Sequence, residues 1–235
     1  MNKINLFGKK YLDTIIVLDR VVQGETNKIY KQVKKIGGSK NLCDVKMNNY
    51  EFILTTSGTK NVYIISETNK SIRTSYVVNV SESKLDSKDL DEINKSYDWT
   101  HVCYLDDIEC YNDLLKLKNN LSVDFCTDMP REKFIEVMKK AKIIFDSRER
   151  KNLYRNINLE TPIIFHDEYG VEIIVNGKKV YSLNNYPLDD LEVNGAGDMF
   201  AAFFLDNYDK LGMQKSAEIA MIQTTEKLKN RNLNE

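Results

Sequence analysis

The feature that most constrains the fold is a series of short apolar runs, separated from one another by turn residues or by helical patterns. The runs are rich in Val, Ile, Tyr and Phe, which is typical of buried strands. They fall at residues 52–54, 62–65, 76–80, 101–105, 121–125, 143–145 and 162–166. Residues 108–119 and 131–140, between the later runs, show helical spacing. Strands that alternate with helices predict an α/β fold with a mostly parallel sheet covered on both faces.

The N-terminal part of the chain carries the same kind of strand pattern. Residues 4–8 are predicted to form a first strand that ends in glycine, and residues 14–18 a second strand rich in β-branched side chains. Residues 28–35 alternate loosely between apolar and polar positions, which predicts a strand exposed on one face. Ser39, which follows two glycines, is suited to cap a short helix.

Two further signals organise the C-terminal part. Asn176-Gly177 stands between the strand-like segments 171–175 and 179–183, and this dipeptide predicts a tight β-hairpin. From about residue 216, apolar side chains fall on one face of a final helix. Because no repeat or proline-rich linker divides the chain, residues 1–235 are predicted to form a single domain.

Composition and charge exclude several classes of function. The net charge is −1 with no basic block, which argues against nucleic acid or an anionic membrane as a partner. The sequence has no apolar run long enough to cross a bilayer, and its first residues lack the apolar core of a signal peptide. The four cysteines show no C-x-x-C spacing and the two histidines lie apart, so neither a zinc site nor a disulfide framework is predicted. We expect a cytoplasmic protein with reduced thiols.

A short stretch near the C-terminus combines three features that suit phosphate chemistry. Gly195, Ala196 and Gly197 are small enough for backbone N–H groups to approach a ligand closely. The apolar run 199–205 predicts a buried helix starting there, and a helix N-terminus attracts anions. Asp198 stands at the junction, where a carboxylate is placed to accept a proton. The combination favours phosphoryl transfer to a hydroxyl.

Simpler interpretations of the same residues were weighed. A Gly-x-Gly turn before a helix is often only structural, and an Asp in the first turn often only stabilises the helix dipole. A nicotinamide-dependent dehydrogenase is disfavoured because Phe200 stands where G-x-G-x-x-G requires its third glycine. A P-loop NTPase is disfavoured because no suitable glycine is followed by Lys and then Ser or Thr.

Residues 194–200, Asn-Gly-Ala-Gly-Asp-Met-Phe, resemble the C-terminal signature of the ribokinase-like (PfkB) carbohydrate and nucleoside kinases. Weaker matches follow the family's order from residue 4 to about 210, so the resemblance covers nearly the whole chain. It implies a three-layer α/β/α fold with a mostly parallel central sheet and a small β-sheet lid. It also implies transfer of the γ-phosphate of ATP to a hydroxyl of a sugar, sugar phosphate or nucleoside. In that reaction Asp198 would be the base and residues 195–197 the anion hole.

The resemblance also implies a substrate-binding set in the N-terminal part. Asp13 is similar to the family's substrate-binding Asp after the first strand. Gly37 and Gly38 resemble its Gly-Gly segment, and Asn41 the Asn that opens the following helix. Carboxylate and amide groups suit the paired hydroxyls of a sugar, and the glycines would let the backbone approach it.

A nucleotide and metal set is implied by three later segments. Asn194, at the start of the C-terminal motif, and His166 and Gly170, in the turn before the hairpin, would lie near the nucleotide. Asp146 and Glu149 resemble the family's Asn-x-x-Glu element, which is associated with magnesium and phosphate. The implied cofactors are therefore ATP and Mg²⁺, and magnesium prefers few carboxylates and several waters.

Strands at about 13–34 and 62–80 would form the family's lid over the acceptor. A closed lid would exclude water that otherwise hydrolyses ATP. Lids of this kind can pair between subunits, so a homodimer through the lid is one expectation.

Some residues depart from the family pattern and keep a second hypothesis open. Val193 replaces the Thr that usually precedes the glycines, Asp146 replaces an Asn, and Ser39-Lys40 stand where a later glycine is usual. The second hypothesis is a catalytically weak or inactive module that binds a sugar or nucleotide.

Overall fold

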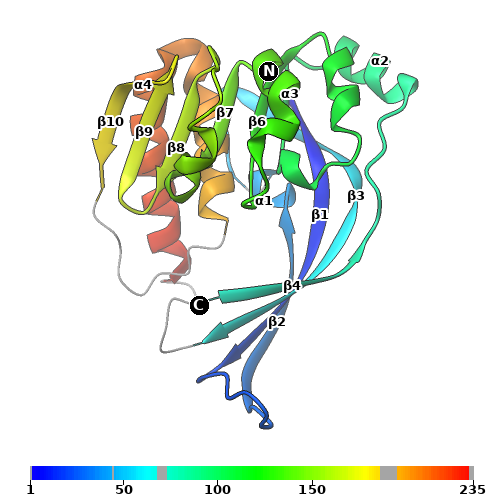
Figure 1. The fold of residues 1–235 in the computed structure, drawn as a ribbon, viewed down its shortest axis with the longest axis vertical. Coiled ribbons are helices and arrows are strands. Elements are labelled where there is room, and N and C mark those ends of the chain that lie inside the picture. Colours follow the sequence, from blue (N-terminus) through cyan, green and yellow to red (C-terminus); the bar gives the residue numbers. More distant parts are fainter. Residues whose placement is uncertain (1, 44, 68–72, 186–194, 233–235) are drawn as a thin grey trace.

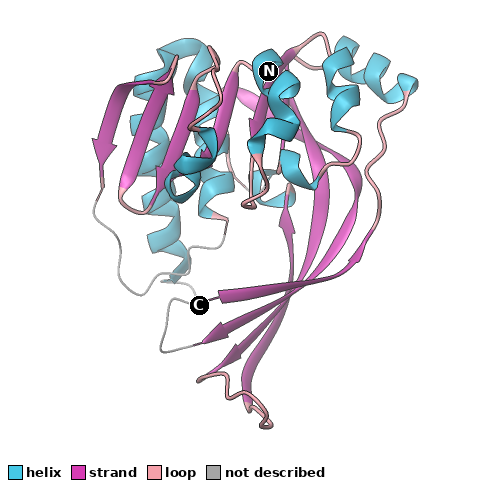
Figure 2. Cartoon of the chain, viewed as in Figure 1, coloured by secondary structure: helices cyan, strands magenta, loops and turns pink. Residues whose placement is uncertain are grey.

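The computed structural model describes residues 2–43, 45–67, 73–185 and 195–232. Within these residues the strands are β1 (Asn2–Leu18), β2 (Ile29–Gly38), β3 (Tyr50–Glu67), β4 (Arg73–Val80), β5 (Trp99–Val102), β6 (Asn120–Asp124), β7 (Ile143–Ser147), β8 (Ile163–Asp167), β9 (Gly170–Val175) and β10 (Lys178–Asn184). They form one sheet in the order β10-β9-β8-β7-β6-β5-β1-β3-β4, and β2 pairs with β1. Figures 1 and 2 show this sheet with helices on both faces.

Helices occupy several connections between strands, and the longest helix follows the last strand. The α-helices are α1 (Lys40–Cys43), α2 (Ser87–Ser96), α3 (Ile135–Lys140) and α4 (Ala196–Asn232). The 3₁₀ helices are η1 (Leu105–Asp107), η2 (Tyr111–Lys116), η3 (Arg131–Phe134) and η4 (Arg148–Tyr154). In α4 the backbone is non-helical at Gly212, whose φ of 71° divides the element into two helices.

The centre of the sheet is parallel and its margins are antiparallel. Strands β3, β1, β5, β6, β7 and β8 pair in parallel, whereas β9, β10, β2 and β4 join in antiparallel fashion. Two apolar layers cover the faces. Ile143 and Phe145 of β7 belong to the cluster that packs on α4, while Ile144 faces the cluster that contains Val137 and Met138 of α3. The predicted three-layer α/β/α arrangement is confirmed.

Strands β1 and β3 are long enough to serve two parts of the molecule. They have 17 and 18 residues, but β1 pairs with β5 only from Ile4 to Phe7. Beyond this segment both strands continue away from the central sheet, where β2 and β4 pair with them (Figure 1). The described residues of the predicted lid segments, at about 13–34 and 62–80, lie in this extension, which we call the lid; residues 68–72 fall outside the described part of the chain.

Some predicted boundaries differ from the structure. The segments 4–8 and 14–18 belong to one strand, because parallel pairing with β3 resumes after an irregularity between Gly8 and Lys10. In place of the helix predicted at 108–119 the structure has only the 3₁₀ helix η2, which has no side-chain cap. The backbone becomes extended at Leu117 and leads into β6. The hairpin about Asn176-Gly177 and the helical run 199–205 are as predicted. No helix in the described part of the chain is long and apolar enough to cross a membrane.

One buried carboxylate ties α4 to the start of β3. Asp206 on α4 is 2% exposed, and its oxygens accept backbone N–H groups of Asn48, Asn49 and Tyr50 at 3.0, 2.8 and 2.9 Å. Charge-assisted bonds of this kind are among the stronger ones in proteins. This contact fixes the helix that begins with the Gly-Ala-Gly-Asp motif against the centre of the sheet.

We predict that Asp206→Ala lowers the free energy of unfolding by about 2–4 kcal/mol, because the three N–H groups lose a charged acceptor. Urea unfolding monitored by circular dichroism measures the change. Asp206→Asn, which keeps one acceptor oxygen, should lose less. An unchanged urea midpoint in Asp206→Ala would contradict the role given to this carboxylate.

Candidate active site

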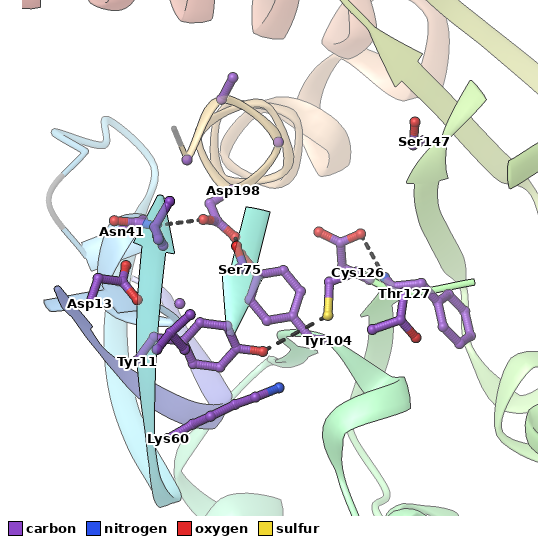
Figure 3. Close-up of a pocket in the computed structure, with 18 of the residues that line it drawn as sticks. Tyr11, Asp13, Asn41, Lys60, Ser75, Tyr104, Cys126, Thr127, Ser147 and Asp198 are labelled. Atoms are coloured by element: carbon purple, nitrogen blue, oxygen red, sulfur yellow. Dashed lines mark hydrogen bonds between the residues drawn. The ribbon is translucent and has the colours of Figure 1, made fainter. Parts of the chain in front are cut away.

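A cavity of about 600 Å³ opens at the carboxyl ends of the parallel strands, where ligands bind in open α/β sheets. The lid forms one wall through Val62, Ile64 and Val77, and the N-terminal end of α4 forms another. Figure 3 shows several polar side chains gathered around Asp198 in this cavity. The cavity brings together residues from both ends of the chain.

The start of α4 is built from small residues that pack closely against other elements. Gly195 has a φ of 78°, and a Cβ there would lie 3.0 Å from the Asn41 side-chain nitrogen. At Gly197 a Cβ would lie 3.2 Å from the His166 ring. Small residues therefore allow this close packing, and the first N–H groups of a helix have no partner within the helix. Gly195, Ala196 and Gly197 all line the cavity.

Asp198 lies in the first turn of α4 and is 3% exposed. Its Oδ2 accepts from Asn41 Nδ2 at 2.7 Å, and its Oδ1 accepts from the Tyr104 hydroxyl at 2.6 Å. Asn41 comes from α1 and Tyr104 from the end of β5. These two donors hold the carboxylate at the cavity wall, where a proton acceptor is useful to a hydroxyl substrate.

The predicted substrate-binding residues converge on the same cavity. Asp13, Gly38 and Asn41 line it, and Asp13 is 6% exposed. Gly37 lies behind them, where a Cβ would collide with the Asp13 carboxylate. Gly38 has a φ of 63°, a conformation that favours glycine. Residues far apart in sequence thus form one polar part of the cavity wall, and Asp13 lies on the same face of the lid as Val62.

A second cavity of about 400 Å³ lies beyond Gly197. Ser147, His166, Ala196 and Gly197 line both cavities, whereas apolar Phe200, Met221 and Leu228 line only the second. Cavities with apolar walls and a few polar groups are typical of ligand sites. Ala196 and Gly197, at the start of α4, therefore lie between two compartments.

The three predicted nucleotide residues fall in different places. His166 separates the two cavities and stacks on Phe200 with ring centroids 4.6 Å apart; its Nε2 has no partner among the described residues. Burial and the nearby Arg150 lower the pKa of His166 to about 4, so the ring is neutral at pH 7. Gly170 lines neither cavity, and its φ of 137° serves the β9–β10 pairing. Asn194 lies outside the described residues.

The predicted metal ligands were tested against their surroundings. Asp146 Oδ2 accepts from Arg131 Nε at 3.0 Å, Arg131 Nη2 at 2.8 Å and the Tyr154 hydroxyl at 2.7 Å. Its Oδ1 accepts from Arg150 Nε at 2.6 Å and the backbone N–H of Ser147 at 2.7 Å. A carboxylate offers about four lone-pair sites, so this group is saturated and does not fit a direct magnesium ligand.

Glu149, the other predicted ligand, is exposed and lines the second cavity. In the part of the chain that the structure describes, no group of three or more His, Cys, Asp or Glu side chains is arranged to hold a metal ion. The assignment of Glu149 to magnesium stays a prediction.

Several cavity residues were not identified from the sequence, and three of them carry polar contacts at the centre of the site. Tyr104 contacts Asp198, Arg150 bridges Asp146 to the cavity, and Asp124 stands at the carboxyl end of β6. Burial, followed by the charges of Asp198 and Asp146, raises the pKa of Asp124 well above its ordinary value. A polar residue at the end of a buried apolar run was the available signal for Asp124. For Tyr104 and Arg150 the sequence contains no comparable signal.

The comparisons with known proteins rest on structure alone. No protein-family model matches the sequence, and a search of curated proteins finds no match. Arabidopsis thaliana ribokinase, solved with ribose and ATP, superposes with a TM-score of 0.68 at 12% identity, over 95% of this chain and 91% of that one. The nucleoside kinase of Methanocaldococcus jannaschii gives 0.67 at 17% identity, over 94% and 89%.

A pyrophosphate-dependent kinase of the ribokinase family, solved with sulfate, gives a TM-score of 0.63 at 16% identity, over 96% of this chain and 95% of that one. These superpositions cover 94–96% of this chain and 89–95% of the other chains. The mostly parallel sheet agrees with the fold expected from the sequence motif. The chain therefore has the ribokinase-like (PfkB) α/β/α fold.

Proposed function

We propose that this protein is a kinase that transfers the γ-phosphate of ATP to a hydroxyl of a sugar, sugar phosphate or nucleoside. The observation that carries the proposal is the position of Asp198. Its buried carboxylate is held by Asn41 and Tyr104 at the wall of a cavity, one residue after the anion site formed by residues 195–197. A proton acceptor beside an anion site is the pair of groups that phosphoryl transfer to an alcohol requires.

The acceptor would occupy the end of the first cavity under the lid. Asp13 and Asn41 stand there, and their oxygens and nitrogen suit the hydroxyls of a sugar or ribose. Aliphatic Val62, Ile64 and Val77 cover that end from the lid. The mixture of polar and apolar walls supports an acceptor that carries hydroxyls on a compact ring.

The proposed step transfers one phosphoryl group to the acceptor and one proton to Asp198. Asp198 takes the proton of the acceptor hydroxyl as its oxygen forms a bond to the terminal phosphorus. The bond between that phosphorus and the bridging oxygen breaks, and the leaving diphosphate keeps the electron pair. The N–H groups of residues 195–197 stabilise the charge on the transferred group.

The donor would extend from the anion site into the second cavity. Phe200, Met221 and Leu228 supply apolar contacts there, and His166 offers a ring nitrogen beside Gly197 that has no partner within the described part of the chain. Burial that lowers the pKa of His166 to about 4 keeps the ring neutral, so it can donate one N–H to phosphate without a charge. These features support ATP as the donor.

Magnesium enters the proposal as the ion that ATP normally carries. When bound to the donor phosphates it would neutralise part of their charge. Asp146 does not fit as its ligand because all its acceptor positions are filled by Arg131, Arg150, Tyr154 and Ser147. Arg150 also lines the cavity, so it is the charged side chain best placed to contact a donor phosphate.

One observation favours a second candidate function, a sugar- or nucleotide-binding module with little catalysis. Asp124 and Asp198 line the same cavity, and the charge of Asp198 contributes to the raised pKa of Asp124. Carboxylates in this arrangement disfavour the approach of a phosphate unless a cation or a proton compensates them. Turnover therefore decides between the two candidates.

We predict that Asp198→Asn lowers ATP-dependent turnover by about 10²- to 10⁴-fold, because a positioned base contributes that much. Phosphorylated product would be measured against a panel of sugars, sugar phosphates and nucleosides, with ATP or pyrophosphate as donor. Asp91→Asn, an exposed position on α2, is the control and should retain full activity.

The two candidates separate in a parallel binding measurement. A ligand that binds the native state raises the thermal midpoint by mass action, whether or not it reacts. Midpoint shifts with sugars or nucleotides but no product from the wild-type protein would favour the binding module. Product formation with equal rates in wild type and Asp198→Asn would contradict the assignment of Asp198 as base.

We also propose that two copies pair through the outer face of the lid. Paired residues on neighbouring strands share a face, which places Leu12 beside Ile36 and Tyr63 beside Tyr76. These four side chains are 42–53% exposed. The opposite face carries Asp13, Val62 and Val77, which line the cavity. A face of exposed apolar side chains on a sheet supports a protein partner.

We predict that the wild-type protein sediments as a dimer and that Tyr76→Lys shifts it to a monomer, because a charge would be buried at the interface. Sedimentation velocity over a concentration series measures this. Val180→Lys, at an equally exposed apolar position on β10, is the control and should leave the dimer intact. A wild-type protein that stays monomeric at about 100 μM would contradict the proposal, since interfaces of standard size bind more tightly.

A further inference from the structure

Tyr104 has a backbone conformation that is unfavourable for its residue type. It follows β5 and precedes η1 with φ 64° and ψ 73°, in the left-handed region. Among the described residues the other non-glycine with positive φ is Asn176, which stands in the hairpin turn where Asn is common. A bulky residue in this region is strained. Such outliers concentrate at functional sites.

The path of the backbone does not require a tyrosine at position 104. A glycine would adopt the same φ without penalty. The local backbone bonds, Cys103 N–H to the Phe7 carbonyl at 2.9 Å and Asp107 N–H to the Tyr104 carbonyl at 2.9 Å, need no side chain at this position. The side chain must therefore supply an interaction that offsets the strain.

That interaction is with Asp198. The Tyr104 hydroxyl donates to Asp198 Oδ1 at 2.6 Å, a short distance typical of a bond to a charged acceptor. The Tyr104 ring packs on Tyr11 with centroids 5.4 Å apart, which fixes its direction. In Figure 3 the Tyr104 ring lies between Asp198 and Cys126, and Asn41 reaches Asp198 from the other side.

The surroundings of Asp198 make such a donor useful. Among the described residues, the other titratable or charged groups that line this cavity or interact with Asp198 are Tyr11 and Asp13 of β1, Lys60 of β3, Cys103 after β5, Asp124 of β6, Cys126 after β6, Arg150 of η4 and His166 of β8. Buried carboxylates that face one another tend to take up a proton. A protonated Asp198 would not serve as a base, and an O–H donor favours its ionised form.

We infer that Tyr104 is a positioning residue for Asp198: its hydroxyl fixes the orientation of the carboxylate and stabilises the ionised form. The inference rests on the proposed function, in which Asp198 takes the acceptor proton. Burial and the charge of Asp198 raise the pKa of the Tyr104 phenol well above its ordinary value, so the hydroxyl remains a donor at neutral and alkaline pH. The strained backbone at Tyr104 is the cost of directing this hydroxyl beneath α4.

The test is Tyr104→Phe, which keeps the ring and removes the hydroxyl. The midpoint of the acid limb of kcat/KM should move up by about 1–2 pH units, because a bond to a charged group of typical strength is lost. At pH 7 kcat should fall about tenfold while both KM values change less than about twofold. If Tyr104 only filled space, the pH profile of Tyr104→Phe would match that of the wild-type protein.

The matched control is Tyr50→Phe. The Tyr50 hydroxyl also donates to an aspartate of α4, Asp209, but neither residue lines the cavity. This variant should keep the pH profile and the kcat of the wild-type protein. Thermal midpoints of both variants show that each has folded.

A second measurement does not depend on turnover. The carboxyl carbon of Asp198, assigned by its loss in Asp198→Asn, is titrated by ¹³C NMR in the wild-type protein and in Tyr104→Phe. Its midpoint should rise in Tyr104→Phe by the same 1–2 pH units. Equal midpoints in the two proteins would overturn the inference. A wild-type protein that phosphorylates no acceptor would instead overturn the proposed function, while the titration still decides the role of Tyr104.

Discussion

The arrangement of the cavity depends on the hydrogen bonds that hold one buried carboxylate, Asp198, at the start of α4. The first residues of α4 line the cavity, and donors for the Asp198 side chain come from other elements of the fold. Asn41 and Tyr104 provide two, and they lie 157 and 94 residues away in sequence. Holding both against Asp198 fixes where α1 and the end of β5 lie. The cavity between them follows from that arrangement.

A second layer of charge lies beneath the cavity and is internally compensated. Arg131 is fully buried; it bonds to Asp146 at 2.8 Å, approaches Asp106 at 3.7 Å and donates to the carbonyls of Met129 and Thr127. Removing one member of such a network leaves an uncompensated buried charge, which is costly. The network therefore holds the ends of β6 and β7 at a fixed spacing, and its carboxylates are occupied by arginines.

The fold was predictable from the sequence, and so were several of the residues that line the first cavity. Strand and helix order followed from apolar runs, and the glycines and carboxylate at 195–198 were recognisable because their chemistry is local in sequence. Tyr104 was not recognisable, because its meaning depends on a partner 94 residues away and on a backbone angle that no pattern indicates. The sequence motif suggested Asp146 as a metal ligand. Its pairing with Arg131 and Arg150 is a contact of the folded chain that the sequence pattern does not reveal.

The lid and the core share the same two strands, which limits how the lid can move. β1 and β3 leave the central sheet at the irregularity between Gly8 and Lys10. Lys9, at this point, is fully buried and paired with Glu109 at 2.6 Å. Burial acts to raise the pKa of Glu109, but hydrogen bonds from Lys9 and Ser83 outweigh it and lower the pKa to about 2. Because this ion pair holds the point where the lid leaves the central sheet, any movement of the lid would involve bending or twisting of the strands beyond Lys9.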